Sequence, residues 1–404
     1  MEKWKEYQLK DVTTILGDGL HGTPKYDEHG TVFFINGNNL VDGKIEIKDS
    51  TKRVSEDEAN KYRKNLNNRT ILVSINGTIG NVAKYKGEPC ILGKSACYFN
   101  VAEDFDLNFI YYVVASQQFK NTITHLATGT TIKNVSLETM RNYSFIAPSI
   151  DEQKRISAIL SSLDDKIELN RRINDNLEQQ VQALFRLWFL DNPNPNWREA
   201  TLSEIALFVG GYSYNGDELT DSSNVAMATI KNFGRNGGFR VDGFKAITPS
   251  GKLKECYYAN MFDILVAHTD LTQNADVIGN AELLLTKGNY ESIIFSMDLV
   301  KVLPNNSFPY KFLLAAMLKN KIFKGHCLGY VNGTTVLHLS KKALPEFEIK
   351  IPSESEANMM NDTLASLYKR MAEVLQENDR LTRLRDTLLP KLMSGELKIN
   401  NLNC

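Results

Sequence analysis

The side chains that usually carry catalytic or metal chemistry are scattered through this sequence of 404 residues. Its six histidines form no HExxH pattern and have no partner at metal-ligand spacing, so we expect no metal site. The chain also lacks a P-loop and a glycine-rich nucleotide fingerprint. We therefore expect no catalytic residue. The histidines are His21, His29, His125, His268, His326 and His338.

Two loops carry side chains that suit hydrogen bonding to nucleic-acid bases. The first follows a strand-like run that ends at Ile35, and the second occupies the matching place in the other half of the chain. Asparagine can form paired hydrogen bonds with adenine, and arginine or lysine with guanine. Asn-Gly and Gly-Arg-Asn-Gly are equally typical of hairpin turns that need positive φ, so both interpretations stay open. The candidates are Gly37, Asn38 and Asn39 in the first loop and Lys231, Asn232 and Arg235 in the second.

A Gly-Thr-Thr loop begins at Gly129 and again at Gly333. Its recurrence indicates shared architecture rather than readout specific to one half. Backbone amides and threonine hydroxyls suit contacts with phosphates, which position a nucleic acid without specifying its sequence. A purely structural turn explains the recurrence nearly as well. The candidate contacts are Thr130, Thr131, Lys133, Asn134, Thr334, Thr335 and His338.

The overall charge is the one bulk property that argues against nucleic-acid binding. With 47 basic and 48 acidic residues, the formal net charge is -1, whereas dedicated binders often carry a basic domain. A neutral chain can still gather lysines on one face, and a partner subunit can supply backbone contacts. One basic cluster could follow phosphates, although most surface lysines are simply solvated. It consists of Lys25, Lys52, Arg53, Lys61, Arg63 and Lys64.

An internal repeat organises these candidates. Ile71-Leu-Val73 recurs as Ile264-Leu-Val266, Ile79-Gly-Asn81 recurs as Ile278-Gly-Asn280, and the Gly-Thr-Thr loops follow in the same order. The offset between the halves grows in small steps, as loop insertions would produce. Each half therefore forms its own domain, and a single core would be unusual at this length.

Within each half, a β-like region gives way to a long helix. Short apolar runs broken by glycine and asparagine fill residues 1–150, and the chain is then glycine-free from Pro148 to residue 190. Apolar residues there alternate at spacings of four and three, as in a coiled-coil seam, and the second half repeats them with Arg385 as the one break. The seam comprises Ile156, Leu160, Leu163, Ile167 and Leu177, then Met360, Leu364, Leu367, Met371 and Leu381.

Neither helix can expose such an apolar stripe alone, so we expect the two helices to pack on each other. A pseudo-twofold axis between the halves would make them antiparallel and would hold the two domains at opposite ends. Asn174 and Asn378 occupy equivalent seam positions, and we expect them to meet near that axis and fix the register. A seam that opens there and leaves both residues wet is the alternative.

The predicted fold class is α+β: two mixed, strand-rich recognition domains separated by an antiparallel pair of long coiled-coil helices. We place domain 1 at residues 1–150 and its helix at 151–190, domain 2 at 191–352 and its helix at 353–397, with a tail at 398–404. Asn192-Pro-Asn-Pro195 superficially resembles the Asn-Pro-Pro-aromatic motif of adenine methyltransferases. It lacks adjacent prolines and an aromatic residue in phase, so we interpret it as the linker into domain 2.

Several segments resemble specificity subunits of type I restriction–modification systems. The helical stretches Asp151-Glu-Gln-Lys-Arg-Ile-Ser-Ala-Ile-Leu160, Gln182-Ala-Leu-Phe-Arg-Leu-Trp-Phe189 and Thr387-Leu-Leu-Pro-Lys-Leu-Met-Ser-Gly-Glu-Leu397 are similar to their central and distal helical regions. His21-Gly-Thr-Pro-Lys-Tyr26 and Ala267-His-Thr-Asp-Leu-Thr272 are similar to segments of their target-recognition domains. The resemblance extends over nearly the whole chain.

The resemblance implies a DNA-binding subunit that reads a bipartite, asymmetric target, with the helices setting the gap. It also implies two copies of an adenine-N6 methyltransferase partner and, in the full assembly, restriction subunits that translocate DNA. S-adenosylmethionine, ATP and magnesium would belong to those partners, with no cofactor in this chain. Phe185, Trp188 and Phe189 offer aromatic area for docking the methyltransferase, unless they simply pack under domain 2.

Two other classes of protein stay open at this point. A nuclease or methyltransferase with fused recognition domains would need a motor, a carboxylate cluster or a cofactor loop, which we do not find. A non-catalytic scaffold or an anti-restriction protein could use the same architecture to hold partners. The N-terminus has no apolar signal core and no segment is apolar enough to span a membrane, so we expect a cytoplasmic protein.

Overall fold

The computed structural model describes residues 4–129, 133–251 and 253–399. Thr130 and Thr131, two of the candidate phosphate contacts, lie outside these residues. The chain divides into two compact units, each described by itself: unit 1 is Met1–Lys166 with Thr382–Cys404, and unit 2 is Ile167–Leu381. Two long helices, α5 (Ile150–Arg186) and α9 (Glu354–Met393), contribute to both units.

Unit 1 is built around a four-stranded antiparallel sheet of order β2-β10-β7-β8. Every residue of the central strand β7 is buried, which suits its β-branched and apolar sequence Thr-Ile-Leu-Val-Ser. A smaller sheet has the order β6-β3-β9, in which β3 and β9 are parallel. The strands are β1 (Lys5–Gln8), β2 (Thr13–Asp18), β3 (Val32–Ile35), β4 (Leu40–Val41), β5 (Lys44–Ile45), β6 (Arg53–Val54), β7 (Thr70–Ser74), β8 (Val82–Lys84), β9 (Cys90–Leu92), β10 (Ala96–Val101) and β11 (Ser144–Ala147).

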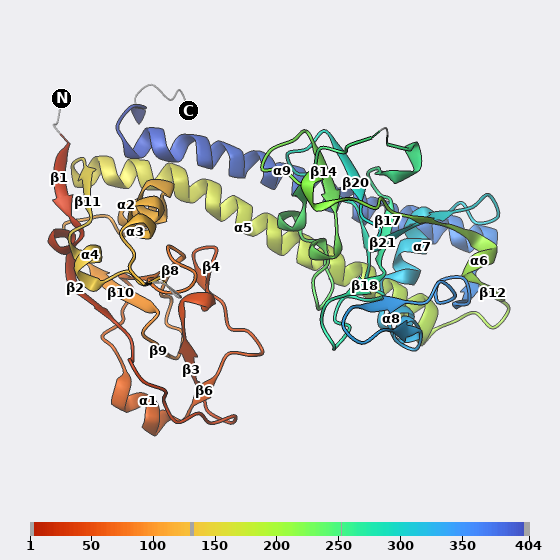
Figure 1. The fold of residues 1–404 in the computed structure, drawn as a ribbon, viewed down its shortest axis with the longest axis horizontal. Helices are drawn as coiled ribbons and strands as arrows, with labels where there is room; N and C mark the ends of the chain where they lie inside the picture. Colours follow the sequence, from red (N-terminus) through yellow and green to blue (C-terminus); the bar gives the residue numbers. More distant parts are fainter. Residues whose placement is uncertain (1–3, 130–132, 252, 400–404) are drawn as a thin grey trace. The chain divides into compact units, whose positions relative to one another are not determined.

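Unit 2 repeats this topology. Its main sheet has the order β13-β21-β17-β19, and its second sheet contains the parallel pair β14 and β20. β12 pairs with β24 as β1 pairs with β11. The predicted strand-rich repeat is therefore present in both units (Figure 1). The strands are β12 (Arg198–Thr201), β13 (Ala206–Gly210), β14 (Val225–Ala228), β15 (Lys245–Ala246), β16 (Tyr258–Ala259), β17 (Ile264–Ala267), β18 (Thr269–Asp270), β19 (Ala281–Leu283), β20 (Ser292–Phe295), β21 (Leu299–Pro304), β22 (Val331–Asn332), β23 (Leu337–Leu339) and β24 (Glu348–Ile351).

Two consecutive helices follow the main sheet in each unit. Ser116 caps the second helix of unit 1 and Asn320 caps that of unit 2, because each side chain accepts a hydrogen bond from the first helical turn. The shorter helices are α1 (Glu56–Tyr62), α2 (Leu107–Ala115), α3 (Gln117–His125) and α4 (Leu137–Arg141) in unit 1, and α6 (Leu202–Ile205), α7 (Lys311–Leu318) and α8 (Lys321–Leu328) in unit 2.

The long helices complete the core of each unit. In unit 1, Ile156 and Leu160 of α5 are buried in one apolar cluster with Leu392 of α9. In unit 2, Leu177 and Val181 of α5 belong to a cluster that includes α9 residues of the predicted seam, namely Met360, Leu364, Leu367 and Met371. Ile167 is also buried, whereas Leu163 and Leu381 are half-buried.

The asparagine contact between the helices differs from our expectation. Asn378 bonds to Asn170, whose Nδ2 lies 2.9 Å from the Asn378 Oδ1, and Asn378 Nδ2 donates in turn to the carbonyl of Ile167. Asn174 does not take this place, and its buried Oδ1 has no hydrogen-bond partner. In an antiparallel pair, residues at equivalent repeat positions face each other only at the exact midpoint. Asn174 lies four residues, about one turn, beyond Asn170.

Polar contacts tie α5 to the rest of each unit. In unit 1, the Tyr112 hydroxyl of α2 donates to Asp164 Oδ2 at 2.6 Å, and Arg385 Nη1 lies 2.9 Å from Asp164 Oδ1 (Figure 1 shows α2 beside α5). In unit 2, Lys319 Nζ lies 2.7 Å from carboxylate oxygens of both Glu178 and Glu282. Arg385, the break in the predicted seam, is thus half of an ion pair.

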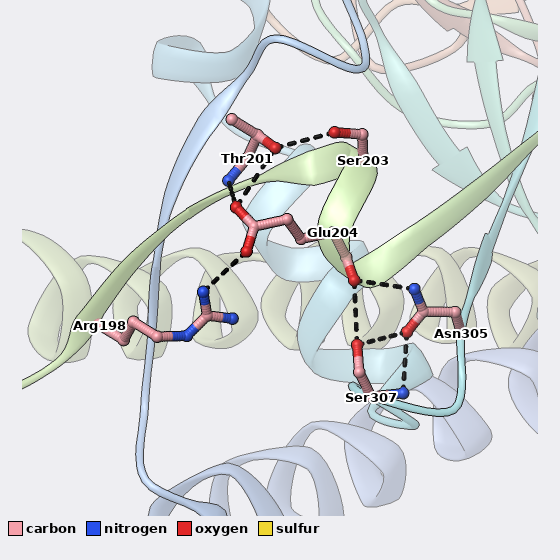
Figure 2. A network of polar contacts seen from close by, with 6 residues as sticks. All are labelled: Arg198, Thr201, Ser203, Glu204, Asn305 and Ser307. Atoms are coloured by element: carbon pink, nitrogen blue, oxygen red, sulfur yellow. Dashed lines mark hydrogen bonds and ion pairs between the residues drawn. The ribbon is translucent and has the colours of Figure 1, made fainter.

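A capping box follows the first strand of each unit. Thr201 N donates to Glu204 Oε1 at 2.8 Å, and Gln8 N donates to Asp11 Oδ2 at the same distance. Figure 2 shows the larger network of unit 2, in which Arg198 also binds Glu204 and the Glu204 carbonyl accepts from Asn305 and Ser307. The hydrogen bond from Arg198 lowers the pKa of Glu204. These contacts fix where the first strand of each unit ends.

Candidate nucleic-acid interface

Three loops of unit 1 meet at one edge, which we call loop edge 1: residues 36–40, residues 74–81, and the described part of residues 128–134. Gly37 N donates to Ser95 Oγ at 2.9 Å, and Asn81 Nδ2 donates to the carbonyl of Leu40 at 3.0 Å. Asn76 forms a β-bridge with Asn134. The middle loop, which follows β7, therefore contacts both of the others.

Loop edge 2 is the corresponding set in unit 2: residues 229–239, 268–280 and 333–338. Asn280 Nδ2 donates to the carbonyl of Gly234 at 2.8 Å, as Asn81 does in unit 1. Gln273 Nε2 donates to the carbonyl of Thr334 at 2.6 Å. The structure thus brings the predicted base-reading loop and the Gly-Thr-Thr loop of each unit together, through a middle loop that follows β7 or β17.

The two innermost asparagines hold these loops rather than project from them. Asn39 is 4% exposed and Asn232 is 0% exposed. The Oδ1 of each accepts from the backbone of the residue three positions earlier, Asn36 or Thr229. Each Nδ2 also donates across its loop, to the carbonyls of Glu46 and Arg240 respectively. Base contact by either amide would require breaking these bonds, so we leave both out of the interface proposed below.

The turn interpretation applies to only one of the two loops. Gly37 lies in a 3-10 helix and has no positive φ, but a Cβ there would lie 2.0 Å from Ser74 Oγ, so close packing requires glycine. In unit 2, Gly237 and Gly238 both have φ near +89°, as a tight hairpin requires. Asn38, Lys231 and Arg235 are exposed, and Arg235 lies 3.6 Å from Asp276.

The Gly-Thr-Thr loops share one backbone conformation at their first residue. Gly129 has φ +111° and Gly333 has φ +110°, so both are left-handed. The remaining candidates on these loops are exposed where the structure describes them: Lys133, Asn134, Thr334, Thr335 and His338. His338 faces Thr269 across the β18–β23 ladder. Burial, together with nearby His338, lowers the pKa of the adjacent His268.

Two members of the predicted basic cluster are paired with carboxylates. Lys61 forms an ion pair with Glu58 at 2.7 Å, and Arg63 pairs with Glu56. Arg53 lies over the ring of Phe33, 4.9 Å from its centroid. Lys25 is exposed, but its backbone N–H donates to Glu58, which places it beside α1 rather than at loop edge 1.

The aromatic residues at the end of α5 pack within unit 2. Phe185 is 9% exposed and stacks on Phe189 at 5.1 Å, and Phe189 contacts Trp197 at 4.9 Å. Trp188 packs against the same apolar core. The aromatic area available for docking a partner is thus smaller than expected, although Leu187 and Leu190 beside it remain 47% exposed.

Sequence reasoning missed the turns that adjoin the loop edges. The β9–β10 turn carries exposed Lys94, and the β20–β21 turn carries Met297, which is 58% exposed. Leu271, in the middle loop of unit 2, is 68% exposed. The internal repeat could have indicated these turns, because each of them follows a strand that recurs in both halves of the chain.

Two kinds of feature are absent from the residues that the structure describes. No three His, Cys, Asp or Glu side chains there come together as ligands for a metal ion. No described helix is both long and apolar enough to cross a membrane.

Comparison with known proteins identifies a family. The family model described as "Type I restriction modification DNA specificity domain" matches residues 1–179 and 194–389. The HindI specificity subunit of Haemophilus influenzae is 25% identical over 332 residues, which cover 66% of this chain and 72% of that protein. The MjaIX specificity subunit of Methanocaldococcus jannaschii is 24% identical and covers 99% of this chain and 94% of its own length.

A solved structure shares the fold. The crystal structure of a type I restriction–modification S subunit from M. genitalium matches with a TM-score of 0.54 and 21% sequence identity. The match covers 97% of this chain and 96% of the other.

Proposed function

Because this chain belongs to the type I restriction–modification DNA specificity family, we propose that it reads a bipartite, asymmetric DNA target, one half-site with each unit. Such subunits recognise the DNA target and are not themselves enzymes, since catalysis lies in other subunits of type I systems. The two half-sites would be short sequences on either side of a fixed gap.

The observation that carries this proposal is the repeated loop edge. In each unit two loops contact the loop that follows β7 or β17, and the same asparagine, Asn81 or Asn280, joins that middle loop to the predicted base-reading loop. The exposed side chains on these loops differ: Asn38 and Lys133 in unit 1, Lys231 and Arg235 in unit 2. A common loop arrangement that carries different exposed side chains suits two units that recognise different DNA sequences.

We further propose that α5 and α9 form an antiparallel coiled-coil pair that sets the gap between the half-sites. α5 has 37 residues, which corresponds to about 56 Å at about 1.5 Å per residue. One turn of duplex DNA is about 34–36 Å, so helices of this length are on the scale needed to separate two half-sites by roughly a turn. A pseudo-twofold relation between the halves would let the units approach opposite strands.

The partners proposed on the same basis are two methyltransferase subunits and, in the full assembly, restriction subunits. S-adenosylmethionine, ATP and magnesium would be bound by those subunits. The contribution of this chain would be to bind, orient and space the DNA. Two identical methyltransferase subunits would have to bind surfaces that recur in both halves of the chain. The long helices α5 and α9 provide such surfaces.

Reconstitution tests the function. The chain, mixed with its methyltransferase partner, should methylate adenine within one bipartite sequence, which sequencing of methylated bases in expressing cells would reveal. Each protein alone should be inactive. A complex that forms without site-specific methylation would instead indicate a scaffold or an anti-restriction protein.

Two variants test the assignment of parts. Insertion of about four residues, close to one helical turn, into α5 should lengthen the accepted gap and leave both half-sites unchanged. Exchange of residues 1–150 for another recognition domain should change one half-site only. An insertion that changed the bases recognised, or an exchange that altered both half-sites, would contradict the proposal.

A further inference from the structure

An exposed leucine projects from the middle loop of loop edge 2. Leu271 is 68% exposed, whereas both preceding residues, Thr269 and Asp270, are at most 5% exposed. Fully burying a leucine side chain is worth about 1.5–3 kcal/mol, and that stabilisation is forgone here. A scattered surface leucine needs no explanation, so the construction of the loop around Leu271 decides what it means.

The loop around Leu271 is held by its own hydrogen bonds. The buried Asp270 carboxylate accepts from Thr272 N and from Val277 N, both at 2.8 Å. Ala275 has φ +51°, a left-handed conformation that a non-glycine residue adopts only at some cost. Gln273 then fastens the loop to Thr334. Leu271 is therefore presented by a rigid turn.

A second exposed apolar side chain lies on the neighbouring turn. Met297 is 58% exposed, and its turn is joined to the Leu271 loop through Asp298, whose Oδ1 accepts from Thr269 Oγ1 at 2.9 Å. The Asp298 carbonyl also accepts from His268 N at 2.8 Å. The acidic side chains of these turns, Asp270, Asp276 and Asp298, all have hydrogen-bond donors or a cation beside them. Their carboxylate oxygens therefore bind groups of the protein itself, and the apolar side chains of Leu271 and Met297 are what these turns expose.

Unit 1 has polar residues in the same places. The β9–β10 turn carries Lys94 where the β20–β21 turn carries Met297, and the loop after β7 exposes Gly77 and Thr78 where unit 2 exposes Leu271. Identical methyltransferase copies would need the same docking surface on both units. The exposed surface of these turns differs between the units. It therefore suits binding of the DNA half-sites, whose sequences also differ between the units.

We propose that Leu271 and Met297 read thymine in the second half-site by apolar contact with its C5-methyl group in the major groove. Among the four bases of unmodified DNA, only thymine offers a methyl group there, so an aliphatic side chain held by a rigid turn can select it. This inference rests on the proposed function and adds to it the chemistry of one half-site. Unit 1, with Lys94 and Asn38 exposed, would read its half-site by hydrogen bonding.

The test replaces thymine by deoxyuridine, which pairs identically and lacks only the methyl group. The chain in complex with its methyltransferase partner is titrated with duplexes that carry deoxyuridine at single positions of either half-site. The second half-site is the one that survives exchange of residues 1–150. One or more substitutions in it should weaken binding about four-fold, the effect of losing one buried methyl group. Substitutions in the first half-site should leave binding unchanged.

Variants assign the effect to residues. Leu271→Ala and Met297→Ala should bind unmodified DNA more weakly and should each remove the penalty at one deoxyuridine position. Leu207→Ala, at an exposed leucine of β13 in the same unit, is the matched control and should keep the full penalty.

Three results would overturn the inference. They are equal binding of all deoxyuridine duplexes, a penalty that persists in both variants, or loss of methyltransferase binding by Leu271→Ala in the absence of DNA. Each leaves sequence-specific binding of the unmodified duplex intact, whereas failure of the proposed function would remove it.

Discussion

The two units attach to the long helices with the same backbone and different chemistry. In unit 1, Tyr112, Asp164 and Arg385 form a polar chain between α2, α5 and α9. The repeat places Ala316, Tyr368 and Val181 at the equivalent positions of unit 2, and all three are buried in its apolar core. The tyrosine thus lies on the short helix α2 in unit 1 and on the long helix α9 in unit 2, and the charged pair of unit 1 is replaced by Tyr368 and Val181 in an apolar cluster.

Unit 2 places its charges elsewhere. Lys319 lies between Glu178 and Glu282, whose side chains are only 20% and 3% exposed. Burial disfavours the charge on Lys319, but the two carboxylates outweigh it and raise the pKa of the ammonium. Burial of Glu282 in turn raises the pKa of its carboxyl. Sheet order and apolar spacing are therefore common to the two units, while the polar attachment of each unit to the long helices varies.

The largest loss of stability is expected at the most buried polar attachment, which is the Lys319 cluster of unit 2. Lys319→Met should lower the free energy of unfolding of unit 2 by about 3–5 kcal/mol, because it leaves the buried Glu282 without its counter-charge. Urea unfolding followed by Trp188 and Trp197 fluorescence would measure it. Lys321→Met, two residues along and exposed, is the control. Equal stability of the two variants would show that the charge cluster does not hold unit 2 together.

The polar chain of unit 1 should matter next. Tyr112→Phe removes a hydrogen bond to a carboxylate and should cost unit 1 about 1.5–3 kcal/mol. Hydrogen exchange of α2 amides would locate the loss in unit 1. Tyr111→Phe, at the neighbouring tyrosine, should have a smaller effect. A loss that appeared equally in unit 2 would argue against separate attachments.

The asparagine pair between the helices is expected to contribute less. Asn170→Leu leaves the Asn378 Oδ1 buried without its donor and should cost about 1 kcal/mol, the low end of the cost of an unsatisfied buried acceptor. The double variant with Asn378→Leu should recover that loss, because both polar groups are then replaced by apolar ones. Thermal unfolding of the three proteins would measure the coupling. A double variant that is the least stable of the three would instead assign the pair a larger structural role.

The smallest effect is a difference in acid sensitivity. Hydrogen bonds from Ser353, Asn194 and Trp197 lower the pKa of Glu356 to about 2, from an ordinary value of 4.5. A lowered carboxyl pKa stabilises the fold above pH 4.5, and that stabilisation is lost as the pH falls toward 2. Glu152, the matching residue of unit 1, lies near Arg155 at 3.6 Å instead.

Titration of Trp197 fluorescence in fixed urea would check this. Wild type and Glu356→Gln should differ above pH 4.5 and converge as the pH falls, whereas Glu152→Gln should leave the acid response of unit 2 unchanged. A constant difference between wild type and Glu356→Gln at all pH values would rule out this origin.

Local patterns were sufficient to predict the helices and the repeat. The glycine-free run after Pro148 and the four-three spacing of apolar residues predicted α5, and the same spacing predicted α9. The parallel pairing of β3 with β9 left no such signal, because its two strands are far apart in the chain and each reads as an ordinary apolar run.

The hydrogen-bond and ion-pair partners of several candidate residues could not be predicted from the sequence, for physical reasons. Asn39 and Asn232 have the composition of base-reading residues, but hydrogen bonds across their loops bury them, and those partners are invisible until the chain folds. The contact of Asn378 with Asn170 depends on where an antiparallel pair is centred, which a repeat does not define. Arg385 interrupts the apolar seam because it forms an ion pair with Asp164, and the sequence alone does not show that the two residues are close.

Unit 1 is discontinuous along the chain, and this affects the order in which the protein can be made. Leu392 is fully buried in the same apolar cluster as Phe109 and Ile156, so the core of unit 1 is incomplete until the last part of α9 has been synthesised. Unit 1, which contains the N-terminal residues, therefore completes its apolar core last. A stop codon near the end of the coding sequence would therefore destabilise unit 1, although every residue of its sheets had been translated.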